Sequence, residues 1–385
     1  MSEAVHDMEM EAGRRPVWAE VDLASLDANY RILRRHIDPS VRMLAVVKAD
    51  GYGHGAAAVG RSLVDAGADS LGVAYVEEGI ELRSAGIETS VLVLGSLFPG
   101  QEQLVVEHRL TPSIYRLDSL VALSDAAQRS GHVVSYHLKV DTGMGRLGLD
   151  LDGLAAFLER ARALEWVKLE GVFTQLSSSE EEDSSYTNLQ TARFREVLKT
   201  LEALGVSGQI SHMANSGGTM FHPDCWLDMV RPGIALYGVN PNGGRAAHFP
   251  LAPVMSLKAR ISFLKRVDAG SPLGYGRSFV TKRKSIIATL PIGYGDGWNR
   301  LLSNRGRVIV GDAFAPIVGR ISMDSTLVDV TDLVSVDVGD EVILIGKRGD
   351  MVITAEEIAG ATQTIPYEVL CRIGKRIPRV YVRGG

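Results

Sequence analysis

The chain has 385 residues, 45% hydrophobic and 23% charged, which is enough for one large core and a second domain. The formal net charge is -5 and Lys and Arg are scattered, which argues against a nucleic-acid partner. Because no polybasic anchor, apolar leader or membrane-length apolar run appears, we expect a cytoplasmic protein without membrane contact. Two cysteines, Cys225 and Cys371, indicate neither a disulfide framework nor a metal site, and no metal is expected.

Residues 16–240 are predicted to form a (β/α)8 barrel of the TIM type. Short runs rich in Val, Ile and Leu alternate with stretches of helical spacing, which is typical of a parallel sheet. Eight such units fit a closed barrel better than an open doubly wound sheet. Helices are expected over 23–36 and 150–165. Strands are predicted near residues 41–47, 69–75, 90–96, 110–115, 132–140, 166–174, 208–214 and 231–238.

Residues 241–385 are predicted to form a mostly antiparallel β domain. They are rich in β-branched residues, are broken by Gly, Asp and Pro, and regain helical spacing only near 355–362. The junction NPNGGRAAHFP, residues 240–250, is a predicted linker because its residues favour turns. Residues 16–23, at the start of the barrel range, could pair with the β domain.

Functional groups of such a barrel belong at the C-terminal ends of its strands. Lys48 ends the first predicted strand in VVKADGYGHG, where partial desolvation would lower its pKa and favour a Schiff base. An ordinary solvated lysine is the alternative. In HLKVDTGMGRLG, Lys139 and Arg146 follow a strand, and the arginine could donate to a phenolate or carboxylate or could simply lie on the surface.

Two later segments could bind a phosphate. GQISHMANSGG places His212, Asn215 and Ser216 before glycines, although a helix cap explains the same pattern. MVRPGIALYG places Arg231 beside the eighth predicted strand, where phosphate-binding barrels often hold their ligand. In the β domain, GYGRSF carries Tyr275, and a tyrosine between glycines is also an ordinary packed aromatic at a tight turn.

Together these segments resemble the alanine racemase family of fold-type III pyridoxal phosphate enzymes. The resemblance extends from PVWAEVDLASLDANYRILR near the start to TIPYEVLCRIGKRIPRVY near the end. Its most specific pieces occur in the family's order: VVKADGYGHG, VDTGMGRLG, RPGIALYG, GYGRSF, GYGDGWNR and GRISMDS.

The resemblance implies pyridoxal 5'-phosphate as cofactor, with Lys48 and Tyr275 as the two catalytic bases. It implies cofactor contacts from Lys48, Tyr52, Arg146, Asn215, Ser216, Arg231, Gly233, Ile234 and Tyr367. It implies Arg146 and Met323 at the substrate carboxylate, and supporting positions at Lys139, Gln175, His212, Tyr294, Arg300 and Asp324. Lys139 matches a lysine that is carbamylated in some family members.

These implied roles are chemically consistent. Racemisation removes the Cα proton from one face and returns one to the other, so it is served well by two bases on opposite sides. The family implies that Tyr275 takes the proton from the L-enantiomer and Lys48 from the D-enantiomer. A phenol needs cationic neighbours to act as a base near neutrality, and Arg300 is a candidate. The family commonly has histidine where this chain has Gln175, which cannot titrate.

The resemblance favours an alanine racemase that supplies D-alanine for peptidoglycan, working as a homodimer in which Tyr275 comes from the partner subunit. A racemase of broad specificity, or one for serine or basic amino acids, is the nearest alternative, because the gate side chains Tyr275, Ile365 and Tyr367 would set substrate size. A fold-type III decarboxylase would carry a cysteine-centred motif near its end, whereas Cys371 lies in a racemase-like segment. A non-catalytic single-barrel pyridoxal phosphate binder would lack the β domain.

Overall fold

The computed structural model describes residues 15–242 and 249–384. Its internal contacts divide the chain into one unit of residues 23–254 and another that joins the residues before 23 to residues 255–383. Part of the predicted linker at 240–250 lies outside the described residues, as do residues 1–14. We call the first the barrel unit and the second the β unit.

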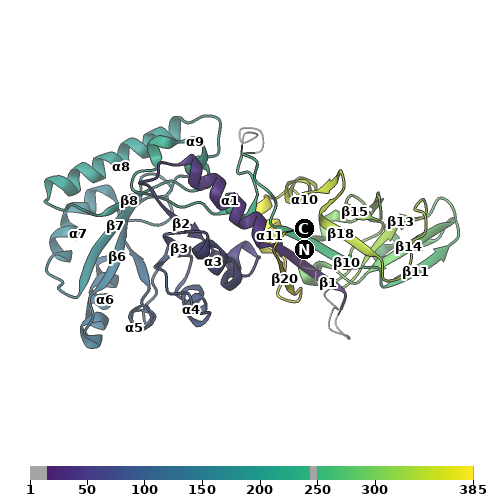
Figure 1. The fold of residues 1–385 in the computed structure, drawn as a ribbon, viewed down its shortest axis with the longest axis horizontal. Helices are drawn as coiled ribbons and strands as arrows, with labels where there is room; N and C mark the ends of the chain where they lie inside the picture. Colours follow the sequence, from purple (N-terminus) through teal and green to yellow (C-terminus); the bar gives the residue numbers. More distant parts are fainter. Residues whose placement is uncertain (1–14, 243–248, 385) are drawn as a thin grey trace, which may run out of the picture. The chain divides into compact units, whose positions relative to one another are not determined.

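The barrel unit is a closed barrel of eight parallel strands, which confirms the predicted architecture (Figure 1). The barrel closes where the first strand pairs with the last through Arg42 opposite Met229. The strands are β2 (Arg42–Val46), β3 (Ser70–Val73), β4 (Val91–Val93), β5 (Thr111–Ile114), β6 (Val134–Lys139), β7 (Val167–Phe173), β8 (Ile210–His212) and β9 (Met229–Val230).

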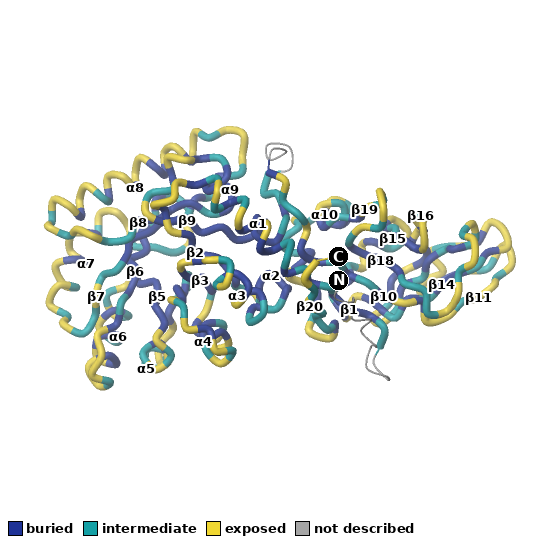
Figure 2. The backbone as a smooth tube through the Cα atoms, in the orientation of Figure 1, coloured by how far each residue is buried: buried dark blue, intermediate teal, exposed yellow. Residues whose placement is uncertain are grey.

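Helices surround this barrel, and the two predicted ones are confirmed over 23–36 and within 150–165. In α1, Leu26, Tyr30 and Leu33 recur at helical spacing and are buried, so one apolar stripe packs inward. Figure 2 shows largely buried strands and outer helices with exposed faces. The helices are α1 (Leu23–His36), α2 (Lys48–Tyr52), α3 (Ala56–Asp65), α4 (Val76–Ser84), α5 (Glu102–Glu107), α6 (Leu117–Ser130), η1 (Leu151–Gly153), α7 (Leu154–Ala161), α8 (Ser185–Ala203), α9 (Ser216–Phe221), η2 (Pro223–Cys225) and η3 (Ile234–Tyr237).

The position predicted for the eighth strand, 231–238, is wrong. The strand is Met229–Val230, and Ile234–Tyr237 forms a 3-10 helix instead. Pro232 has no backbone N–H for a strand ladder, which ends the strand early. All four residues of the 3-10 helix are buried, and a short buried apolar run cannot be assigned to strand or helix by its pattern.

The β unit contains a mixed sheet in the strand order β16-β15-β18-β10-β1-β20, with β19 paired to β18. The first strand of the chain joins this sheet: Ala19 lies opposite Leu257 in an antiparallel pair and opposite Arg379 in a parallel one. The strands are β1 (Val17–Asp22), β10 (Met255–Arg260), β15 (Arg307–Val310), β16 (Ala313–Pro316), β18 (Glu341–Arg348), β19 (Met351–Ile353) and β20 (Arg379–Val382).

A second, three-stranded antiparallel sheet and a short hairpin complete the strands of the β unit, so the predicted antiparallel domain is confirmed. The helix expected near 355–362 is α10 (Ala355–Thr362), capped by the Thr354 hydroxyl, which accepts from the Glu357 N–H. The remaining elements are β11 (Phe263–Val267), β14 (Ser285–Leu290), β17 (Thr326–Asp329), β12 (Pro272–Leu273), β13 (Phe279–Val280), η4 (Tyr275–Arg277), η5 (Tyr294–Asp296), η6 (Arg300–Leu302) and α11 (Pro366–Cys371).

None of the helices in the described ranges combines the length and the apolar character needed to cross a membrane. Within the same ranges, no group of three or more His, Cys, Asp or Glu side chains is arranged to hold a metal ion.

Candidate functional site

Lys48 stands at the point where β2 gives way to an unusual turn. The next four residues, from Ala49 to Tyr52, all have positive φ, between 52° and 60°. A non-glycine residue in this left-handed region costs about 1 kcal/mol or more, so other contacts must hold the turn. Glu78 accepts from the Ala49 N–H at 2.7 Å, and Asp50 accepts from the Ala56 N–H at 2.9 Å. The turn therefore fixes the backbone on both sides of Lys48.

Arg146 lies in a turn after β6 that Asp141 organises. The Asp141 carboxylate accepts from the backbone N–H groups of residues 143, 144 and 145 at 2.8 to 2.9 Å. From α8, Tyr186 donates to the Gly143 carbonyl at 2.8 Å, and Arg193 donates to the Thr142 carbonyl at 2.9 Å. Arg146 is thus an exposed side chain on a well-ordered turn.

Four cationic side chains converge at the C-terminal end of the barrel strands: those of Lys48, Lys139, Arg146 and Arg231. Lys139 is 4% exposed, and its Nζ donates to the Leu94 carbonyl at 3.0 Å. Burial, together with the charges of Arg231, Arg146 and Lys48, lowers the pKa of Lys139 to about 7. Of the charged neighbours that act on Lys139, only Asp141 opposes them. Such a cluster suits an anionic ligand.

Arg231 follows β9 directly and is 3% exposed. Its Nη1 donates to His212 at 2.9 Å, and its Nη2 donates to the Thr174 carbonyl at 2.9 Å. Burial lowers the pKa of Arg231 to about 9, so the guanidinium stays cationic at neutral pH. Within the described residues, its Nε has no acceptor and no carboxylate contacts it. This N–H is available to a ligand.

Gln175, which replaces the family's histidine, does lie beside Arg231. Its Oε1 accepts from Arg231 Nη2 at 3.2 Å, and its own Nε2 donates to the Leu176 carbonyl at 3.3 Å. Gln175 therefore helps to orient the guanidinium without carrying a titratable proton.

A polar cradle adjoins the cationic cluster. Ser216 Oγ accepts from the N–H groups of Gly233 at 2.9 Å and Ala235 at 3.3 Å. A Cβ on Gly233 would come 2.3 Å from the Tyr52 hydroxyl, so only glycine allows this close approach. Asn215 caps α9 by accepting from the Gly218 N–H at 3.0 Å. Buried Ile234 completes the cradle.

The barrel unit fits pyridoxal phosphate, the cofactor that the resemblance implies. The cradle of Tyr52, Ser216 and Gly233 offers hydroxyls next to closely approaching backbone, and the four cations balance phosphate and phenolate charge. The Arg231 N–H that lacks an acceptor suits a ring nitrogen.

In the β unit, Tyr275 lies at the turn between β12 and β13, and its side chain is 72% exposed. A Cβ on the neighbouring Gly276 would lie 2.8 Å from Nη1 of Arg320, so this guanidinium packs against the turn. Sequence reasoning chose Arg300 as the cationic neighbour and missed Arg320. The signal was present in GRISMDS, where this arginine precedes Met323.

Met323 and Tyr294 lie on two connected loops of the β unit. Ser322 accepts from the Tyr294 N–H at 3.0 Å, and Met323 accepts from the Gly295 N–H at 2.9 Å. Asp324 pairs with Arg376 at 2.7 Å. The side chains of Met323 and Tyr294 are 52% and 43% exposed. This surface can therefore contact a substrate.

The other predicted residues of the β unit lie on short helices. Arg300 begins η6, and Tyr367 lies in the first turn of α11, just after exposed Ile365. Lys48 belongs to the barrel unit, whereas Tyr275, Met323 and Tyr367 belong to the β unit.

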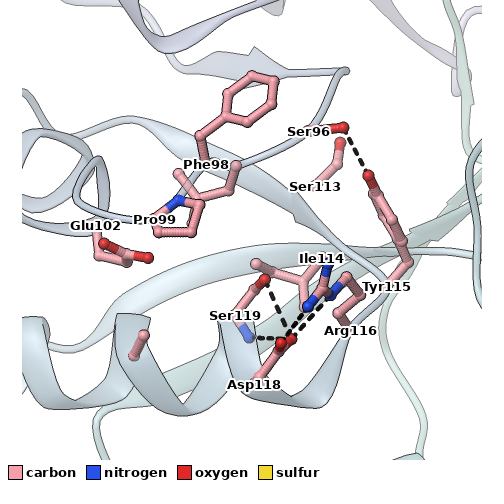
Figure 3. A pocket seen from close by; sticks show the side chains of 12 residues that line it. Ser96, Phe98, Pro99, Glu102, Ser113, Ile114, Tyr115, Arg116, Asp118 and Ser119 are labelled. Atoms are coloured by element: carbon pink, nitrogen blue, oxygen red, sulfur yellow. Dashed lines mark hydrogen bonds and ion pairs between the residues drawn. The ribbon is translucent and has the colours of Figure 1, made fainter.

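A cavity of about 310 Å³ lies elsewhere in the barrel unit, beside the loops that follow β4 and β5 (Figure 3). In it, the hydroxyls of Ser96 and Tyr115 are 2.7 Å apart, and Arg116 pairs with Asp118. None of the residues predicted for the site lines this cavity. The cationic cluster and its cradle, and not cavity volume, identify the candidate site.

Comparisons with known proteins agree with this geometry. The family models "Alanine racemase, N-terminal domain" and "Alanine racemase, C-terminal domain" match residues 21–241 and 254–381. The chain is 46% identical over 369 residues to an alanine racemase from Symbiobacterium thermophilum, covering 96% of this chain and 98% of that protein.

Two solved structures are also similar. An alanine racemase from Bacillus anthracis with bound L-Ala-P has a TM-score of 0.92 and 34% identity, over 97% of this chain and 96% of that one. An alanine racemase from Bartonella henselae with covalently bound pyridoxal phosphate has a TM-score of 0.86 and 36% identity, over 96% of this chain and 100% of that one.

Proposed function

The chain belongs to the alanine racemase family, and we propose that it interconverts L-alanine and D-alanine with pyridoxal 5'-phosphate, using Lys48 and Tyr275 as two bases. The observation that carries this proposal is the convergence of Lys48, Lys139, Arg146 and Arg231. An anionic cofactor at that cluster would meet the Tyr52–Ser216–Gly233 cradle with its phosphate.

When bound, pyridoxal phosphate supplies the electron-withdrawing ring that makes the Cα proton of an attached amino acid acidic. Lys48 would hold the cofactor covalently, and Arg146 would donate to its phenolic oxygen. Asn215, Ile234 and Tyr367 would join the cradle around the phosphate.

Lys48 and Tyr275 would divide the proton transfer between the two faces of Cα. Tyr275 Oη takes the proton from the L-enantiomer while Lys48 Nζ delivers one to the opposite face, and the reverse reaction exchanges these roles. The Arg320 guanidinium packs against the turn that carries Tyr275 and would help to position its phenol.

Arg231 would determine where the proton returns. A guanidinium donates a hydrogen bond but does not transfer its proton, so Arg231 leaves the ring nitrogen unprotonated. With an unprotonated ring nitrogen, the cofactor would withdraw electrons less strongly than when a carboxylate keeps that nitrogen protonated. Protonation at Cα would then be favoured over transamination. His212 and Gln175 hold Arg231 in this position.

The substrate carboxylate would lie at Arg146 and the Met323 loop, with Tyr294 and Asp324 supporting that loop. Tyr275, Ile365 and Tyr367 would limit the size of the side chain that enters. A pocket narrowed by these side chains would favour alanine over larger amino acids.

Lys139 is a candidate for carbamylation. With its pKa near 7, a large fraction of the amine is neutral at physiological pH and can attack CO2. The N–C bond forms as one amine proton leaves to water, and a buried cation becomes an anion beside Arg146. Native mass spectrometry would show the added mass of one CO2, which Lys139→Met would lack.

The working unit is a homodimer in which Tyr275 reaches the partner's barrel. The 72% exposure of its side chain suits a contact made by another subunit. Mixing Lys48→Ala with Tyr275→Phe subunits tests this, because each mixed dimer would have one site with both bases. About a quarter of wild-type activity should return after random exchange. No recovery would show that each chain uses its own tyrosine.

Such an enzyme in the cytoplasm would supply D-alanine for peptidoglycan. Expression in a bacterium that needs added D-alanine for growth should remove that requirement. The Lys48→Ala variant is the matched control and should not support growth.

The direct test is incubation of the purified protein separately with L-alanine, L-serine, L-lysine and L-arginine, followed by chiral chromatography. Fast conversion of alanine alone supports the proposal. Comparable conversion of the larger amino acids would make the protein a broad-specificity racemase, and a cofactor absorbance band without any conversion would refute racemisation.

A further inference from the structure

A line of polar contacts runs from Arg231 into the barrel. Arg231 Nη1 lies 2.9 Å from His212 Nδ1, and His212 Nε2 lies 2.8 Å from His137 Nδ1. His137 Nε2 in turn lies 3.5 Å from a carboxylate oxygen of Glu170. The two imidazoles are 0% and 4% exposed, and the four residues come from β6, β7, β8 and the end of β9.

Only one arrangement of protons gives every donor along this line an acceptor. A guanidinium only donates, so His212 Nδ1 must accept. A neutral His212 then carries its proton on Nε2 and donates it to His137 Nδ1. His137 in turn carries its proton on Nε2, which faces the Glu170 carboxylate. All donors point from Arg231 towards Glu170.

The charges along the line support this arrangement. Burial first, and then the charge of Arg231, hold the pKa of His212 well below its usual range, so His212 is neutral. The contact with His137 lowers the pKa of Glu170 and keeps it ionised, with help from Lys168 and Arg42. The neutral His212 and, beyond it, His137 thus connect a buried cation to a carboxylate.

Glu170, the last residue of this line, lies towards the N-terminal ends of the barrel strands, opposite the end that carries Arg231. A cavity of about 110 Å³ opens among the first residues of the strands, and His137, Glu170, Arg42 and Asp69 are among its lining residues. The Glu170 side chain is 39% exposed, whereas Arg231 is 3% exposed. The carboxylate is therefore hydrated while the cation it balances is not.

Phe173 holds the imidazole plane of His212. The two rings are stacked with centroids 4.8 Å apart and an interplanar angle of 3°. The Lys139 ammonium and the Arg231 guanidinium lie 5.2 and 5.3 Å from the Phe173 centroid. Because this stacking fixes the imidazole of His212, it is the tautomer of His212, and not the orientation of its ring, that must match the neighbouring groups.

We propose that His137 and Glu170 are positioning residues for Arg231: they fix His212 in the tautomer that accepts from the guanidinium, and so direct the remaining Arg231 N–H groups at the cofactor. The inference rests on the proposed function for the ligand that Arg231 meets, but the proton arrangement itself does not depend on catalysis.

The opposite proton arrangement shows why the carboxylate matters. If His137 carried its proton on Nδ1, His212 Nε2 would accept it, and the His212 proton would move to Nδ1. An N–H would then face the Arg231 N–H, and a buried donor would lose its acceptor. An acceptor at position 170 removes this alternative.

The first measurement is the 15N NMR spectrum of the histidine-labelled holoenzyme, with His137→Phe and His212→Gln spectra to assign the two rings. In the wild type, both imidazoles should carry a proton on Nε2, and His212 should stay neutral between pH 7 and 9. A His212 protonated at Nδ1, or at both nitrogens, overturns the proposal.

The second measurement compares four variants of the holoenzyme. His137→Phe keeps a ring but removes the acceptor, whereas His137→Asn places a carbonyl oxygen near the former Nδ1. Glu170→Gln keeps an acceptor and removes the charge. Thr111→Val is the control, because Thr111 borders the same cavity but takes no part in the contacts from Arg231 to Glu170.

We expect His137→Phe to lower kcat about tenfold with little change in KM, and to shift the cofactor absorbance band. His137→Asn should recover most of both losses, Glu170→Gln should lie between wild type and His137→Phe, and Thr111→Val should match wild type. Equal losses in His137→Asn and His137→Phe, or a comparable loss in Thr111→Val, would indicate a structural effect and refute the proposal.

The two proposals fail separately. A wild type with the expected tautomers but no racemisation refutes the proposed function and leaves the proton arrangement intact. A racemase with the wrong His212 tautomer refutes this inference alone. If His137→Phe does not fold, the wild-type NMR spectrum still decides.

Discussion

The candidate site residues of the two units differ in how firmly they are held. In the barrel unit, Arg231 and Lys139 are buried and hydrogen-bonded, and Arg146 lies on a turn organised by Asp141. In the β unit, Tyr275 and Met323 are mostly exposed. The proposed cofactor site of the barrel unit is preformed, whereas the side chains proposed for the β unit would need another surface to act on.

The largest effect is expected from Lys48→Ala, which removes the covalent attachment and one base. Turnover should fall by about 10⁴-fold or more, and the absorbance band of the bound cofactor should disappear. Far-ultraviolet circular dichroism checks that the fold is retained. Retention of the band would mean that another lysine holds the cofactor.

Tyr275→Phe removes the proposed base of the β unit and leaves the residues of the barrel unit unchanged. We expect the cofactor band to remain while racemisation falls by about 10² to 10⁴-fold. In D2O, exchange of the Cα proton should be slowed much less for D-alanine than for L-alanine. Equal losses for the two enantiomers would contradict the faces assigned to the two bases.

Lys139→Met tests the electrostatic cost of the preformed cluster in the protein without cofactor. With the folded pKa lowered from 10.5 to about 7, the unfolded chain binds more protons than the folded protein between these values. The free energy of unfolding of the wild type should rise with pH across that window, by at most about 1.4 kcal/mol per pH unit.

Urea unfolding of both proteins at pH 7, 8 and 9 measures this slope. Lys139→Met, which has a similar length and no charge, should lack the contribution, so the difference between the two proteins should change with pH. Parallel curves would mean that Lys139 titrates normally when folded.

The smallest effect is expected from Gln175→His. Gln175 accepts from Arg231 and has no titratable proton, so the wild-type rate should show no ionisation from this position. Histidine should change kcat only a few-fold but add an ionisation near neutral pH. Gln175→Asn is the control for changed geometry, and an ionisation that appears in both variants would contradict this explanation.

The local pattern predicted most of the fold. The apolar stripe of α1, the helical spacing of α10 and seven of the eight barrel strand positions follow from residues that are neighbours along the chain. The eighth strand was placed wrongly because buried Ile234–Tyr237 has the composition of a strand. Pro232 was the available signal against it.

The candidate site was predicted in part. Lys48, Arg146 and Arg231 were chosen from strand ends and from the resemblance, and the structure brings them together with Lys139. His137 and Glu170 were not chosen, because they lie within strands where the pattern indicates only alternation. Arg320 was missed because its neighbour in space, Gly276, is distant in sequence.

By itself, the sequence determined the architecture and the residue types at the strand ends, because periodicity and turn chemistry depend on adjacent residues. Only the tertiary structure decided which of those side chains are buried together and which way their protons point. Arg231, His212, His137 and Glu170 lie on or beside four different strands, and barrel closure alone brings them into contact. Burial then makes each hydrogen bond depend on the next, which no local pattern can encode.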